Sequence, residues 1–89
     1  MRVLANNRAS RQPIKSALLE LAIATAVKNA DPSCENFIGV FIKRAPPKSR
    51  SDANWAVRGV KFGKAEREPC NAALSVIVER LKREFEISD

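Results

Sequence analysis

A block of cations in the middle of the chain holds the residues best suited to chemistry. Residues 43–64 (KRAPPKSRSDANWAVRGVKFGK) contain seven Lys or Arg, one carboxylate and the only Trp. Cations at this density attract phosphates, which provides affinity without selecting a base sequence. The alternative is a solvated hairpin tip whose charges prevent aggregation. The cations that we expect to contact phosphates are Lys43, Arg44, Lys48, Arg50, Arg58, Lys61 and Lys64.

The charge of the 89-residue chain is unevenly distributed. The formal net charge is +6, and residues 36–64 alone carry seven basic and one acidic side chain. Residues 65–89 carry four basic and six acidic side chains. This layout indicates an electrostatically polar molecule rather than a uniformly basic one.

The residue types for catalysis are scarce. The chain has no His and no Tyr, no glycine-rich phosphate loop and no paired carboxylates at active-site spacing. General acid–base and nucleophilic catalysis depend on such groups. We therefore expect a non-enzymatic protein with no cofactor and no small-molecule substrate.

The two cysteines, Cys34 and Cys70, are too few for a disulfide-stapled scaffold. Without His, one chain cannot complete a zinc site, and the alternative is a symmetric dimer that offers four thiolates. We expect both to be reduced, buried thiols, which predicts a cytoplasmic protein. No apolar run approaches 18 residues, so we expect no membrane span.

Apolar periodicity predicts two helices. The first begins near Pro13 and ends before Pro32, with a stripe at Ile14, Ala17, Leu18, Leu21, Ala22 and Thr25. Ile23 and Val27 lie off this stripe, so this helix is apolar around much of its girth. The second begins near Pro69, with a stripe at Cys70, Ala73, Leu74, Ile77, Leu81 and Phe85.

Two strands are predicted between the helices, at residues 37–42 and 54–62, joined by a loop over 44–53. Strict alternation puts both apolar and charged side chains on each side of the second strand. A bulge at Arg58-Gly59 resolves this, because one extra residue reverses the side to which the following side chains point. The residues then expected in the core are Trp55, Val57, Val60 and Phe62, together with Ile38, Val40 and Ile42 of the first strand.

These elements predict a small α+β domain of order helix-strand-strand-helix, with two helices packed on one face of an antiparallel hairpin. Residues 1–12 are interpreted as a basic, disordered arm and residues 13–89 as the single domain. Alternation leaves Phe37 and Phe41 exposed on the outer face of the hairpin, beside Lys43, Arg58 and Lys61.

Two functions of different classes follow from this outer face. An exposed pair of Phe favours a homodimeric protein-interaction or structural module, built either as a continuous four-stranded sheet or face to face. The alternative is nucleic-acid (RNA or DNA) binding, in which the Phe rings stack bases and the cations of residues 43–64 hold phosphates.

The stretch RAPPKSRSDANWAVRGVKFGKAEREPCNAAL, residues 44–74, resembles part of a double-stranded-RNA-binding domain. The resemblance lies in a proline-containing loop between strands and an alanine-rich last helix. It implies RNA contacts at Lys15, Lys28, Arg44, Lys48, Arg50, Lys64 and Arg67. The chain departs from that family because it lacks the third strand, the loop histidine and a Lys-Lys pair at the last helix. As a whole it resembles small uncharacterised bacterial proteins of unknown function, which implies no activity.

Overall fold

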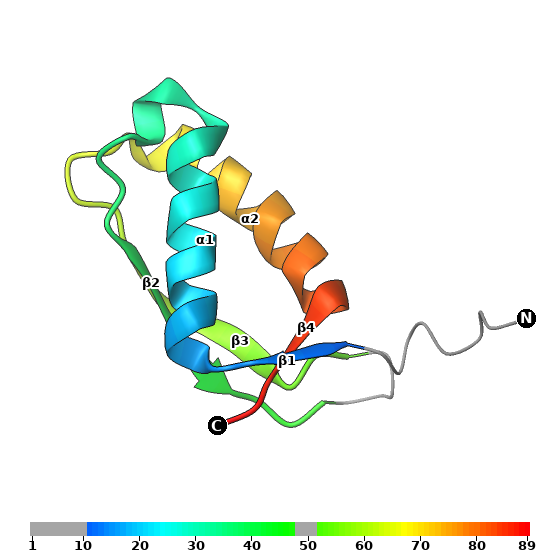
Figure 1. Cartoon of the computed structure of the whole chain (residues 1–89). Coiled ribbons are helices and arrows are strands. Elements are labelled where there is room, and N and C mark those ends of the chain that lie inside the picture. The colour runs from blue at the N-terminus through cyan, green and yellow to red at the C-terminus, as the bar shows by residue number, and fades with distance from the viewer. Residues whose placement is uncertain (1–10, 48–51) are drawn as a thin grey trace, which may run out of the picture.

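The computed structural model describes residues 11–47 and 52–89 of the chain. Its elements are β1 (Gln12–Ile14), α1 (Ser16–Ala30), the 3-10 helix η2 (Pro32–Cys34), β2 (Gly39–Arg44), β3 (Trp55–Lys61), α2 (Arg67–Glu84) and β4 (Phe85–Ile87) (Figure 1). The α+β class is confirmed, but the strands do not form one hairpin. A second, parallel pair of strands, β1 and β4, forms a sheet separate from the antiparallel hairpin of β2 and β3.

The two helices do not share the hairpin equally. Helix α1 lies along β2, whereas α2 packs mainly against α1, η2 and β4 (Figure 1). The prediction of two helices on one face of the hairpin is therefore too simple. Side chains from both helices and both hairpin strands still join one core that includes Leu19, Trp55 and Leu74.

The first strand begins inside the segment interpreted as an arm. Residues 1–10 lie outside the described residues, but Gln12 pairs with Phe85 as the start of β1. Pro13 lies in this strand rather than in the first turn of α1, which begins at Ser16. A proline is tolerated in a short strand because the missing N–H costs nothing where that group faces away from the partner.

The bulge predicted in the hairpin is confirmed. Phe41 pairs with Gly59 and Ile42 pairs with Val57, so Arg58 is the extra residue of β3. The bulge turns Trp55 inward, where it is only 1% exposed. Its indole Nε1 donates to the backbone oxygen of Phe85 at 3.1 Å, which satisfies the polar atom of a buried ring.

The predicted orientations of two residues at the start of the first strand are wrong. Phe37 is 1% exposed, with its ring edge-on to Phe62 at 5.9 Å between centroids, whereas Ile38 is 58% exposed. Strand β2 begins only at Gly39, and the amide of Phe37 donates to the oxygen of Cys34 in the turn after η2. The alternation of β2 therefore does not extend back to these residues.

The side of α1 that faces the core is opposite to the predicted one. Leu19, Ile23 and Val27 are fully buried, whereas Leu18 and Leu21 of the predicted stripe are exposed. A helix that is apolar nearly all round carries no strong signal of which side is inward. In α2 most of the predicted stripe is confirmed, since Cys70, Leu74, Ile77 and Leu81 are buried and Ala73 is half-buried. Phe85, the last residue of that stripe, lies beyond the helix in β4.

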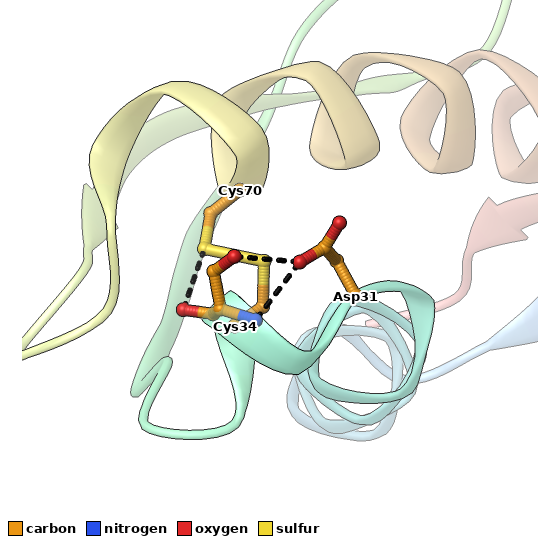
Figure 2. Close-up of a disulfide and its surroundings, with 4 residues drawn as sticks. Asp31, Cys34 and Cys70 are labelled. Atoms are coloured by element: carbon orange, nitrogen blue, oxygen red, sulfur yellow. Dashed lines mark hydrogen bonds between the residues drawn. A yellow bond between two sulfur atoms is a disulfide. The ribbon is translucent and has the colours of Figure 1, made fainter.

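The expectation of two reduced thiols is wrong, because Cys34 and Cys70 form a disulfide (Figure 2). The bond joins η2 to the first turn of α2, where the amide of Glu66 also donates to the oxygen of Ser33. The cytoplasmic location predicted from reduced thiols therefore loses its basis, because disulfides persist mainly in oxidising compartments. Both thiols are consumed, so a four-thiolate zinc site is incompatible with this state.

Side chains fasten the C-terminal strand to the hairpin and to α1. The side-chain amide of Asn54 makes two hydrogen bonds to the backbone of Ile87, as a neighbouring strand would. Its Nδ2 donates to the oxygen of Ile87 at 3.1 Å, and its Oδ1 accepts from the Ile87 amide at 2.9 Å. The carboxylate of Asp89 accepts from both the amide and the hydroxyl of Ser16 at the N-terminus of α1. Two elements that are distant in sequence are thus joined at this end of the domain.

Acid is expected to weaken these contacts. The hydrogen bond from the Ser16 hydroxyl, with that from its amide, lowers the pKa of Asp89, and Ser33 lowers the pKa of Asp31 in the same way (Figure 2). A lowered folded-state pKa contributes stability above the unfolded value, and that stability is lost as pH falls through the folded value. The free energy of unfolding should therefore decline below about pH 4. Urea unfolding against pH should show a weaker decline in Asp89→Asn, and an unchanged pH dependence would contradict this assignment.

Candidate nucleic-acid-binding face of the hairpin

Phe41 is the centre of the solvent-facing side of the β2–β3 hairpin. Its neighbours along the strand, Val40 and Ile42, are buried on the core side, so alternation directs the half-buried Phe41 outward. Gly59 lies opposite it in β3, where a Cβ would stand 3.5 Å from the ring. This distance is ordinary van der Waals contact, so the Phe41 ring packs directly over the Gly59 position.

Two cations of β3 are held on this ring. The guanidinium carbon of Arg58 lies 5.1 Å from the centroid of the Phe41 ring, and the Lys61 Nζ lies 5.5 Å from it. Lys43 is two residues beyond Phe41 on β2 and therefore points to the same side. We call these four residues, Phe41, Lys43, Arg58 and Lys61, the hairpin face.

The bulge creates this arrangement. Arg58 is the extra residue of β3, so the alternation reverses after it, and Arg58 and Lys61 both lie on the side of Phe41. The ring quadrupole attracts both cations and restricts their motion. Because the side chains are already ordered, less entropy is lost when they bind an anion.

The positive charge of the hairpin face is not neutralised locally. Within residues 11–47 and 52–89, no ion pair joins Lys43, Arg58 or Lys61 to a carboxylate. All three side chains are exposed. Uncompensated cations on an open surface raise the local potential and attract polyanions.

The other predicted phosphate contacts do not join this face. Arg44 follows Lys43 and points to the other side of β2, where its Nη2 donates to the backbone oxygen of Asp89. Lys64 is exposed in the turn that follows β3. Lys48 and Arg50 lie outside the described residues. Two of the seven predicted cations thus lie over one aromatic ring, and Lys43 lies on the same side of the hairpin.

The pair of Phe predicted as a protein interface is not present on this face. Phe37 is in the core, and only Phe41 remains, bordered by three cations. Two such faces brought together in a symmetric dimer would place like charges opposite one another, which is unfavourable. The outward side of the hairpin is better suited to an anionic partner than to a copy of itself.

The guanidinium of Arg58 has the chemistry for stacking as well as for hydrogen bonds. A guanidinium has N–H donors at its edge and a planar face that can stack on another planar group. Unpaired bases stack on Arg planes, while phosphates accept from the guanidinium edge and from Lys. The hairpin face can therefore contact both parts of a single-stranded nucleic acid.

Metal and membrane chemistry receive no support from the described part of the chain. Across residues 11–47 and 52–89, no three His, Cys, Asp or Glu side chains gather closely enough to hold a metal ion. In the same ranges, neither helix is both long enough and apolar enough to cross a bilayer.

One surface feature was missed by reasoning from the sequence. Leu18, Leu21 and Ile38 were all assigned to the core, yet each is more than half exposed. The available signal was the scarcity of charge in α1, whose only charged residues are Glu20 and Lys28.

Comparison of the chain with protein-family models, curated proteins and solved structures finds no match in any of the three.

Proposed function

We propose that this protein is a non-enzymatic module that binds single-stranded nucleic acid, RNA or DNA, through the hairpin face. The observation that carries the proposal is the pair of cations, Arg58 and Lys61, held on the ring of Phe41 with no ion pair to a carboxylate among the residues that the structure describes. The face is open rather than enclosed, which suits an extended polyanion better than a small molecule.

The chemistry of the contact predicts its selectivity. Phosphate contacts from Lys43 and Lys61 carry no base information, so the protein should bind many sequences with similar affinity. Stacking on Arg58 requires an accessible base plane, which single strands offer and duplexes do not. We therefore expect single strands to bind more tightly than a duplex of the same length.

Binding to labelled oligonucleotides of about 20 nucleotides tests this proposal, because a strand of that length exceeds the usual site size. Fluorescence anisotropy at moderate salt should give a Kd of about 1–100 µM for single-stranded RNA or DNA. A Kd of about 1 mM or weaker for every nucleic acid would contradict the proposal. A preference for duplex RNA would contradict the stacking role of Arg58 and favour recognition of duplex shape.

A further inference from the structure

Helix α1 has two apolar sides, and only one of them faces the core. Leu19, Ile23 and Val27 are fully buried, whereas Leu18 is 55% exposed and Leu21 is 63% exposed. A helix that is apolar all round is normally covered on all sides. The exposed side of α1 therefore has the composition of a buried surface.

From Ala17 to Thr25 this exposed side carries no charged residue, and Lys28 follows at its C-terminal end. We call it the α1 outer face, and it consists of Ala17, Leu18, Leu21, Ala22 and Thr25, all of which are exposed. The exposed side of α2 is different, since it carries Glu79, Arg80 and Arg83. The contrast between the two helices marks the α1 outer face as a contact surface rather than an ordinary solvated one.

A groove runs beside the α1 outer face. It has a volume of about 290 Å³ and lies between α1 and the start of β2, with Leu21, Ala24, Ile38 and Val40 among its lining residues. Ile38 forms an apolar rim that is 58% exposed. Protruding leucines and a groove of matching chemistry thus lie next to each other on one surface.

The charges of the groove are of opposite sign. Glu20 and Lys61 both line it, and the Glu20 Oε2 accepts from the Ile42 amide at 2.8 Å, which fixes the carboxylate on β2. A two-fold axis beside the groove would carry each carboxylate toward the ammonium group of the other copy. Such reciprocity is the requirement for an isologous interface, in which one patch serves both subunits.

We infer that the α1 outer face binds a second copy of this chain, with Leu18 and Leu21 of each copy placed in the groove of the other. The patch contains both the protruding side chains and the groove that receives them, and its charges complement themselves. The small residues Ala17 and Ala22 allow the two helices to approach closely. This dimer uses α1 and the groove beside it, and it does not depend on nucleic-acid binding. Because Phe41 and Lys61 line the groove and also belong to the hairpin face, dimerisation and nucleic-acid binding would compete for these two residues.

Sedimentation equilibrium of the whole chain tests this inference. The wild-type protein should sediment as a dimer at micromolar concentrations, and Leu18→Glu/Leu21→Glu should raise the dimer dissociation constant by at least about a hundredfold, because charges would be buried without partners. Val76→Glu is the matched control, since Val76 is 71% exposed on α2, and it should leave the dimer unchanged.

A second variant covers the case in which the double variant fails to fold. Ala22→Glu introduces one charge at an exposed helical position, and circular dichroism should show native helix content with a weakened dimer. A monomeric wild-type protein at about 100 µM would overturn the inference, since a surface that stays uncovered there is not a stable self-interface. Dimers of wild-type strength in both glutamate variants, or a dimer lost only in Val76→Glu, would also overturn it.

Discussion

Reduction of the Cys34–Cys70 disulfide is expected to lower the free energy of unfolding by about 4 kcal/mol. The two residues are 36 positions apart, and the entropy of closing a loop of that length gives this magnitude. The loop encloses η2 and the whole β2–β3 hairpin, so reduction also frees the segment that carries the hairpin face. Because small domains have only about 5–15 kcal/mol of stability in total, the loss is a large fraction.

Thermal unfolding with and without a reductant measures this effect. The reduced protein should unfold about 15–30 °C lower than the oxidised one. The variant Cys34→Ser/Cys70→Ser is the control, because its unfolding temperature should not respond to the reductant. The disulfide would be contradicted if the protein kept without reductant had two titratable thiols per chain after unfolding and gave the same unfolding curve with and without reductant.

Removal of the cations of the hairpin face is expected to weaken nucleic-acid binding by roughly a hundredfold at low salt, because each phosphate contact releases a counterion. The variant is Lys43→Gln/Arg58→Gln/Lys61→Gln. All three side chains are exposed, so the fold should be preserved. Fluorescence anisotropy with the same single-stranded oligonucleotide measures the change.

A variant of equal charge separates a local contact from the effect of net charge. Lys28→Gln/Arg80→Gln/Arg83→Gln removes three exposed cations from the two helices, outside the hairpin face. It should weaken binding only slightly, because screening suppresses attraction beyond about 10 Å. Equal losses in the two variants would mean that total charge, rather than the hairpin face, determines the affinity.

The elements with one-sided patterns could be predicted from the sequence. In α2 the apolar stripe is bordered by charge, and only one orientation buries it. In β3 strict alternation would put Trp55 and Lys61 on one side, so one extra residue was needed and Arg58 provides it. The core position of Trp55 and the outward position of Arg58 followed from that single inference.

The remaining features depend on tertiary contacts that no local pattern contains. Helix α1 is apolar on nearly all sides, so its sequence does not show which side faces the core. In the structure α1 packs against β2 with Ile23 buried and Leu21 exposed. Strands β1 and β4 are three residues each, too short for alternation, and the second continues directly from α2. The disulfide joins residues that only the folded chain brings together.

The hairpin face itself was predicted in part. The sequence placed Lys43, Arg58 and Lys61 beside Phe41, and the structure brings Arg58 and Lys61 onto its ring. Phe37 was misplaced because it precedes β2 and belongs to the turn after η2. The correction removes the second aromatic residue and changes the character of the face from apolar to cationic.

The salt dependence of binding to a single strand tests the central claim most directly. The logarithm of the binding constant should fall linearly with the logarithm of salt concentration, by about 0.7 per phosphate contact. The claim predicts a slope about 2 units shallower for Lys43→Gln/Arg58→Gln/Lys61→Gln than for the wild-type protein, with the control variant unchanged. Equal slopes for the wild-type protein and the hairpin-face variant would contradict the claim that these three cations hold phosphates.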